Sequence, residues 1–254
     1  MNSLWIFPIA VGAGAFGSML GLGGGIILVP ALTLLFGVPI KQAVAASLVA
    51  VAATSCAGVQ SYLHAGLVDW RLGVRLLIPT LLGAIAGGLM IGFIPGEMVR
   101  WLFIVLILYV LSQMLWAMRH PTPPQETRPD CRTVWNPRQR GIAVGLSILG
   151  GVISALLGVG GGLIQVPLIH TILKAPLRCA IGTSTFLIGA TASASALLYL
   201  VQGKLQPDTV VPATLGIVIG ARLGVKIAQR MPTLALRLIF VGVMLYTVVR
   251  LALK

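Results

Sequence analysis

Long runs without a charged residue recur along nearly the whole sequence. The clearest cover residues 42–63, 76–96, 101–118 and 179–203. Each is close to the roughly 20 residues with which an α-helix crosses a bilayer. Only 9% of the residues are charged, whereas soluble domains carry about 25%. We therefore predict an all-α polytopic membrane protein, and because no stretch is left for a soluble catalytic domain, we do not expect an enzyme.

An internal repeat divides the sequence. Shifting the chain against itself by 137 positions places residues 21–30 over residues 158–167, where seven of ten positions are identical. Further pairs at this offset are Pro39 and Pro176, Ser47 and Ser184, Thr54 and Thr191, and Gly66 and Gly203. A gapless match of this length predicts two homologous halves. We place these membrane repeats at residues 1–118 and 141–254, joined by an Arg- and Pro-rich connection at residues 119–140.

Each half contains an apolar piece too short to cross a bilayer. In order, a half has a first apolar segment (4–20 and 141–157), a glycine cluster, a short piece (26–36 and 163–173) and three longer segments. An 11-residue helix reaches only about 16 Å of a hydrocarbon core about 30 Å thick. Paired, interrupted segments at matching positions of two halves indicate the binding site of a transporter. Whether the first interrupted pair crosses the membrane or re-enters stays open.

Basic residues indicate the orientation. The formal net charge is +13, but nearly all basic residues lie in short connections, so we interpret them as topology signals rather than as a nucleic-acid surface. If residues 119–140 are cytoplasmic, twelve basic residues lie inside and five outside. The inside set is Arg71, Arg75, Arg119, Arg128, Arg132, Arg138, Arg140, Lys174, Arg178, Lys226, Arg230 and Arg237, and the outside set is Lys41, Arg100, Lys204, Arg250 and Lys254. This predicts inverted halves with both termini outside and, since residues 1–4 lack a basic region, no removable signal peptide.

The glycine clusters are the first candidates for the binding site. They comprise Gly21, Gly23, Gly24 and Gly25 in the first half and Gly158, Gly160, Gly161 and Gly162 in the second. Glycine lets the backbone leave helical geometry and approach a solute closely. The half-helices that follow would direct free N–H groups and positive dipole ends at the break, which favours an anion. The alternative is that these glycines serve only tight helix packing.

Polar residues near the breaks extend the candidate site. Hydroxyls can donate to an oxyanion without burying a charge, which favours Ser47, Thr183 and Ser184, although membrane serines and threonines also bond to their own helix. Gln165 replaces Leu28 of the first half, and its amide can donate either to substrate or to a broken-helix carbonyl. Arg222 lies within an apolar run and is either functional or part of a snorkelling basic stripe.

Acidic residues fall only in the connections. They are Asp69, Glu97, Glu126, Asp130 and Asp208. The carboxylates of a proton or sodium relay are therefore missing from the predicted spans. The outward movement of an anion from a negative interior follows the field and needs no coupled cation.

The three cysteines, Cys56, Cys131 and Cys179, show no metal-ligand spacing. We expect each to be an apolar filler or a free thiol, and we expect no metal and no cofactor.

The doubled Gly-x-Gly-Gly-Gly-x-x-x-Val-Pro motif, with Pro39, Pro176 and residues 182–184, resembles the sulfite exporter TauE/SafE family. The resemblance covers essentially the whole chain and implies an inner-membrane permease for sulfur-containing anions such as sulfite or organosulfonates. We expect a small anionic solute and the lipid bilayer as partners, no nucleic acid, and either a monomer or a homodimer. The alternatives are a passive anion channel and an intramembrane enzyme using Ser184 and His170. The enzyme is disfavoured because no carboxylate can orient the histidine.

Overall fold

The computed structural model describes residues 5–19, 23–119, 131, 137–228 and 233–253. All regular structure in these ranges is helical, which confirms the predicted all-α class. The first half contains α1 (Ile6–Met19), α2 (Gly25–Leu35), α3 (Ile40–His64), α4 (Trp70–Met90) and α5 (Gly96–Arg119). The second half contains α6 (Pro137–Leu157), α7 (Gly162–Pro167), the π-helical segment η2 (Leu168–Ile172), α8 (Leu177–Val201), α9 (Pro207–Ala228) and α10 (Thr233–Ala252).

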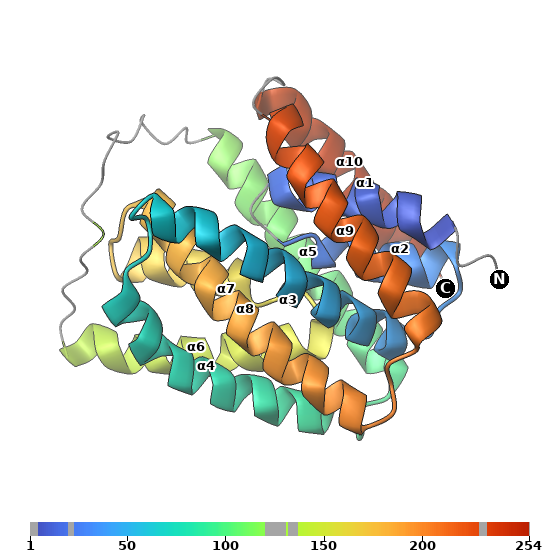
Figure 1. Ribbon diagram of the computed structural model, residues 1–254, viewed down its shortest axis with the longest axis horizontal. Coiled ribbons are helices and arrows are strands. Elements are labelled where there is room, and N and C mark those ends of the chain that lie inside the picture. The colour runs from blue at the N-terminus through green and yellow to red at the C-terminus, as the bar shows by residue number, and fades with distance from the viewer. Residues whose placement is uncertain (1–4, 20–22, 120–130, 132–136, 229–232, 254) are drawn as a thin grey trace.

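Helices that correspond across the repeat make corresponding contacts. The most extensive packing joins α1 to α9, and the matching pair, α6 and α4, follows it. Helices α3 and α8, which are each other's counterparts, pack together at the centre (Figure 1). There Gly58 faces Thr185, and Ser55 faces Gly189. Since residue numbers rise along α3 as they fall along α8, the two helices run antiparallel.

Glycines permit the two matching crossings. A Cβ atom on Gly14 of α1 would lie 2.3 Å from the carbonyl oxygen of Ile217 on α9. At the corresponding crossing, a Cβ atom on Gly151 of α6 would lie 2.1 Å from the carbonyl oxygen of Thr80 on α4. Both distances are far shorter than any real contact, so only glycine allows the backbones to approach this closely.

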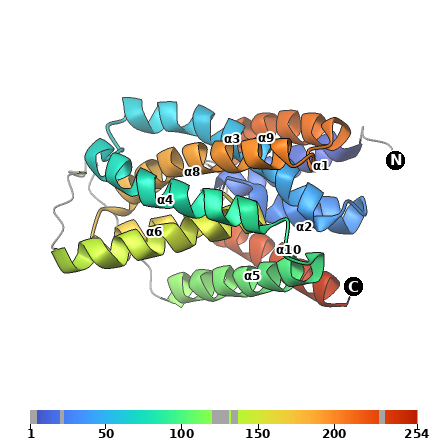
Figure 2. The same cartoon turned by 90° about the horizontal axis from the view of Figure 1, so that it is seen from below.

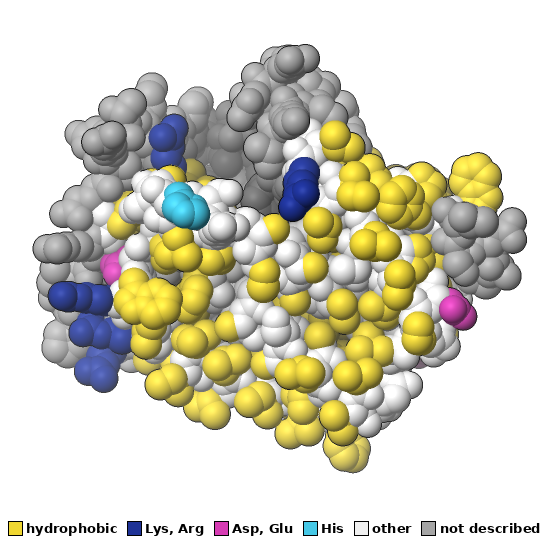
Figure 3. Space-filling view, viewed as in Figure 1, with side chains coloured by type: hydrophobic (Ala, Val, Ile, Leu, Met, Phe, Trp, Pro, Cys, Tyr) yellow, Lys and Arg dark blue, Asp and Glu magenta, His cyan; other side chains and the backbone are white. Residues whose placement is uncertain are grey.

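The outer surface of the bundle suits a bilayer. Five of the described helices are long and apolar enough to cross a membrane: α3, α4, α8 and the described parts of α5 and α6. Large apolar side chains such as Ile78 and Leu82 of α4 are more than half exposed. Figure 3 shows hydrophobic side chains spread across one face, with Lys and Arg gathered at its left edge near the starts of α4 and α6. A multi-pass membrane protein accounts for this surface.

The helix ends separate into two groups. In Figures 1 and 2, α1 starts and α10 ends on the right, whereas α5 ends and α6 starts on the left. The start of α3 and the loop after α8 share the first group, because Lys41 and Lys204 are close enough to interact. Burial lowers the pKa of Lys204, and the charge of Lys41 lowers it further. We call these the terminal end and the connection end of the molecule.

One cysteine prediction is wrong. Cys131 and Cys179 form a disulfide with their Cα atoms 5.5 Å apart, whereas Cys56 is free and exposed. The two paired cysteines are 48 residues apart in the sequence. Their spacing gave no sign of the pair, because Cys131 comes from the connection and meets α8 only in the folded chain.

Candidate functional site

Two helices begin inside the bundle directly after the glycine clusters. Helix α2 begins at Gly25 with Gly24 as its N-cap at φ 79°, and α7 begins at Gly162 with Gly161 as its N-cap at φ 69°. Residues with a side chain rarely adopt such positive φ values. Neither N-terminus receives a hydrogen bond from a capping side chain. The first backbone N–H groups of both helices are therefore available to an incoming acceptor.

The two short helices run to opposite ends of the bundle. Helix α2 leads into the start of α3, and α7 continues through η2 towards the start of α8. Because α3 and α8 are antiparallel, these starts lie at opposite ends (Figure 1). The N-termini of α2 and α7 thus both lie in the middle of the bundle, and their C-termini point outwards.

The breaks contact each other. A Cβ atom on Gly25 would lie 2.4 Å from the carbonyl oxygen of Gly158, and Ser47 Oγ donates a hydrogen bond of 2.6 Å to the same oxygen. A Cβ atom on Gly160 would lie 2.7 Å from both Val51 and Ile188. Val51 on α3 and Ile188 on α8 occupy equivalent positions in the repeat, so one apolar pair packs against the meeting point of the two breaks.

The three hydroxyls that the sequence singled out have different surroundings. All are fully buried. Ser47 bonds the second break, and Thr183 Oγ1 accepts a 2.9 Å bond from the backbone N–H of Asp69 at the start of α4. Ser184 Oγ has no partner among the described residues and lies beside Gly162. Ser184 is thus the one of the three hydroxyls that makes no hydrogen bond with a described residue, whereas the Thr183 hydroxyl accepts a bond and only the Ser47 hydroxyl donates one.

The second break is more polar than the first. Gln165 Nε2 donates a 3.1 Å bond to Thr80 Oγ1, whereas Gln165 Oε1 has no described partner. Ser154 packs beside Gly161 and is also buried without a described partner. At the repeat-equivalent positions, Gln165 corresponds to Leu28, Ser154 to Gly17, and Thr80 to Ile217. Buried polar groups are normally bonded, so the second break has hydrogen-bonding capacity that no described residue uses.

A cavity of about 830 Å³ adjoins the first break. It lies between α1, α3, α8 and α9. Its lining includes Gly23, Ser55, Gln60, Thr185, Ile188 and Arg222. Thr185 Oγ1 donates to its own helix at Ile181, as the alternative for membrane hydroxyls anticipated. Ser55 makes no side-chain hydrogen bond within the described part of the chain, so its hydroxyl is available to a guest in the cavity.

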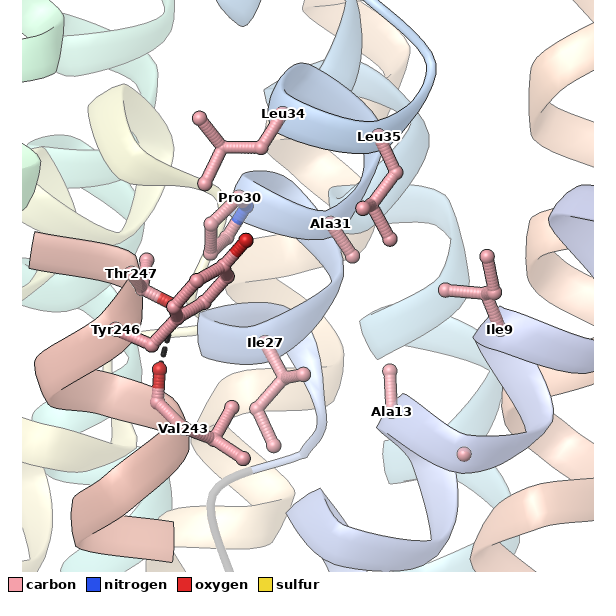
Figure 4. Close-up of a pocket in the computed structure, with 11 residues that line it drawn as sticks. Ile9, Ala13, Ile27, Pro30, Ala31, Leu34, Leu35, Val243, Tyr246 and Thr247 are labelled. Atoms are coloured by element: carbon pink, nitrogen blue, oxygen red, sulfur yellow. Dashed lines mark hydrogen bonds between the residues drawn. The ribbon is translucent and has the colours of Figure 1, made fainter. Parts of the chain in front are cut away.

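A second cavity, of about 270 Å³, is apolar. Figure 4 shows it between α1, α2 and α10, with Ile9, Ile27 and Pro30 facing Tyr246 and Thr247. The hydroxyl of Thr247 donates to the carbonyl of Val243 on its own helix. None of the described residues that line this cavity carries a charged donor for an anion.

The structure therefore brings together only part of the predicted site. Gly23 and Arg222 line one cavity, and the remaining described glycines form the two breaks. Thr183 is engaged in joining α8 to α4, and the Gln165 amide is engaged with α4. Gly21 lies outside the described residues. Sequence reasoning did not select Ser154 or Gln60, because neither has an equivalent polar residue in the other half that could have drawn attention to it.

A family model for the sulfite exporter TauE/SafE matches residues 6–251 of the chain. This match spans nearly every described helix. The chain belongs to the sulfite exporter TauE/SafE family. The helical bundle described above is therefore that of a member of this membrane transporter family.

Individual proteins similar to this TauE/SafE chain are described as probable membrane transporters. The probable membrane transporter protein YunE of Bacillus subtilis is 26% identical over 92% of this chain and 91% of its own length. The probable membrane transporter protein MJ0441 of Methanocaldococcus jannaschii is 24% identical over 91% of this chain and 88% of its own. A probable membrane transporter protein of Xylella fastidiosa is 30% identical over 84% of this chain and 79% of its own. No solved structure matches the chain.

Proposed function

We propose that this protein exports a small sulfur-containing oxyanion, such as sulfite or an organosulfonate, and that the anion binds at the two glycine breaks. One observation carries the proposal: two helix N-termini without capping side chains begin in mid-bundle and lie in contact. A helix N-terminus offers N–H donors and a partial positive charge, which suit an oxyanion. The unpaired hydroxyls of Ser184 and Ser154 add neutral donors beside α7.

The distribution of carboxylates supports an anion rather than a cation. Asp69 caps the start of α4, and Glu97 and Asp208 lie in the first turns of α5 and α9. None of these described carboxylates lies in the middle of a span. A metal cation or an ammonium ion at the breaks would meet positive helix ends without a compensating negative charge.

Alternating access is the proposed mechanism. The antiparallel packing of the repeat-equivalent helices α3 and α8 supports two halves with opposite orientation. Inverted halves with broken helices characterise carriers in which one part rocks against the other around a central site. Transport that saturates with substrate concentration would distinguish this mechanism from a passive anion channel.

Export is the direction that needs the least additional machinery. An anion that leaves a cell with a negative interior gains about 2.3 kcal/mol per charge for each 100 mV. We propose that the protein resides in a bacterial-type inner membrane with the connection end in the cytoplasm.

A binding screen tests the class of substrate. Purified protein is heated with sulfite, sulfate, thiosulfate, sulfoacetate, phosphate or divalent metal cations at millimolar concentration. We expect one or more sulfur oxyanions to raise the unfolding temperature, because a ligand that binds only the folded state stabilises it. Stabilisation by a metal cation alone, with none by any oxyanion, would overturn the proposed site and substrate class.

A further inference from the structure

The cavity beside the first break opens at the connection end. Gln60, Ser61 and Tyr62 of its lining come from the last turns of α3, and Thr185 comes from the first third of α8. Both regions lie at the connection end because the two helices are antiparallel. At the other extreme the lining reaches Gly23, next to the N-cap of α2. The cavity therefore leads from one face of the bundle to the first glycine break.

Apolar side chains close the cavity at its inner limit. Ile188 lines the cavity and also packs on Gly160 together with Val51. Ile217 of α9 lies against Gly24. Val51 and Ile217 are fully buried, and Ile188 is nearly so. In this conformation the break is approached from the connection end, and the apolar contacts lie between the cavity and the terminal end.

The cavity carries a positive charge without a negative partner. Arg222 of α9 lines it and forms no ion pair with any described residue. No described Asp or Glu belongs to the lining. A cationic side chain in a concave, partly apolar site raises the local concentration of anions more than the same charge on an open surface.

Neutral donors lie on the helix that faces Arg222. Helix α3 packs against α9 and contributes Ser55 and Gln60 to the lining. Ser55 is only 4% exposed, although it makes no side-chain bond within the described chain. The Gln60 amide offers two further N–H donors. A guanidinium group opposite hydroxyl and amide donors is an arrangement that recognises an oxyanion rather than a neutral solute.

We propose that this cavity is an entry site for oxyanions, separate from the glycine breaks, in which Arg222 supplies the charge and Ser55 and Gln60 supply hydrogen bonds. The inference rests on the proposed function, since it places the first contact of the same anion before the breaks. The ligand class is a sulfonate or sulfite-type head group. Substrate reaches this site from the connection end before the two halves move.

Cysteine labelling measures the charge of the cavity without measuring transport. Cys56, Cys131 and Cys179 are replaced by Ala, and Ser55→Cys is introduced. The variant reacts with an anionic sulfonatoethyl or a cationic trimethylammonioethyl methanethiosulfonate reagent. We expect the anionic reagent to react faster relative to the cationic one than at Gln206→Cys, an exposed control at the terminal end. Arg222→Gln should lower the anionic-to-cationic rate ratio at Ser55→Cys about fivefold or more, whereas Arg222→Lys should preserve it.

Protection identifies the ligand. Ethanesulfonate, which does not react with thiol reagents as sulfite does, should slow labelling at Ser55→Cys and not at Gln206→Cys. Thr185→Cys gives the same readout if Ser55→Cys does not fold. The entry site would be overturned if Arg222→Gln left the anionic-to-cationic rate ratio unchanged. It would also be overturned if ethanesulfonate slowed labelling at neither Ser55→Cys nor Thr185→Cys.

Transport assays separate this inference from the proposed function. Arg222→Gln should raise the half-saturating concentration of sulfoacetate about tenfold with little change in the maximal rate, since an entry site acts on substrate recruitment. Arg71→Gln, which removes an exposed charge outside the cavity, should change neither. If labelling behaves as expected but no oxyanion is transported, the proposed function fails, and the cavity stands as an oxyanion-binding site but not as an entry site. If oxyanions are transported but Arg222→Gln does not change the labelling rate ratio, the entry site is refuted and the proposed function stands.

Discussion

At the scale of single residues, the glycines of the breaks are needed for two reasons: a backbone conformation with positive φ and close contact between the two breaks. Gly24 and Gly161 adopt positive φ values, which permit the chain to turn into α2 and α7. Gly25 also allows the two breaks to touch, because a side chain there would collide with the carbonyl of Gly158. A larger residue would therefore both strain the backbone and separate the breaks.

Leucine at these positions should abolish transport. We expect Gly24→Leu and Gly161→Leu each to reduce the rate of sulfoacetate flux at least about a hundredfold while the protein still reaches the membrane, because misplacing binding groups by about 1 Å costs this much. Gly145→Leu is the matched control, since Gly145 of α6 has open space around it. Flux is measured in vesicles normalised for protein content. Normal flux in both break variants would show that the glycine breaks do not hold the substrate.

Residue type could be predicted at the site, but residue partners could not. The sequence identified Ser47, Thr183 and Gln165 as buried donors near the breaks. Each of them bonds a group from a distant part of the chain: Gly158, the N–H of Asp69, and Thr80. Such partners depend on how the halves pack, which the pattern within one half does not contain.

At the scale of helices, the interrupted segments were predicted closely. Residues 26–36 and 163–173 were expected as short helices, and the structure has α2 at Gly25–Leu35 and α7 with η2 at residues 162–172. The sequence pattern indicates both ends of each short segment. A glycine cluster ends the helix before it, and a connection that contains Pro39 or Pro176 separates it from the helix after it. The π-helical form of η2 was not anticipated. Proline alone does not explain it, since Pro30 lies at the position equivalent to Pro167 and α2 remains α-helical.

The close crossings of α1 with α9 and of α6 with α4, and the large cavity, could not be predicted from the sequence. Gly14 and Gly151 are isolated glycines within apolar runs, and only the contacts with α9 and α4 show why they are needed. The cavity depends on the angle between α3, α8 and α9, which hydrophobic patterning does not specify. Arg222 could be named as a candidate from its place in an apolar run, but its neighbours could not.

At the scale of the whole molecule, the charge asymmetry predicts which end is cytoplasmic. We expect the connection end to be inside, because that orientation places most basic connections in the cytoplasm. Arg140→Cys at the connection end and Gln206→Cys at the terminal end are exposed reporters in a background without native cysteines. In intact cells, an impermeant maleimide should label Gln206→Cys, and it should label Arg140→Cys only after permeabilisation. The reverse labelling pattern would refute the orientation.

The same orientation predicts the redox state of the two paired cysteines in the cell. Cys131 and Cys179 pair at the connection end, and if that end is cytoplasmic, as proposed, reductants there hold thiols reduced. In this orientation the two residues are neighbouring thiols in the cell and pair on oxidation, so the reporters for topology lie elsewhere. The division into repeats at residues 1–118 and 141–254 stays a prediction from the internal match, while the matching contacts of α1 with α9 and α6 with α4 are consistent with it.

The proposed transport cycle moves a sulfur oxyanion through a site without a cation relay. The most direct test is the current carried by sulfoacetate leaving proteoliposomes loaded with it, with protein-free liposomes as the control. We predict a saturable efflux in which negative charge moves outward with the substrate, driven by an inside-negative potential, without sodium and without an imposed proton gradient. A result in which no sulfur oxyanion produces a protein-dependent flux, or in which the flux requires sodium or a proton gradient, would contradict the proposed function.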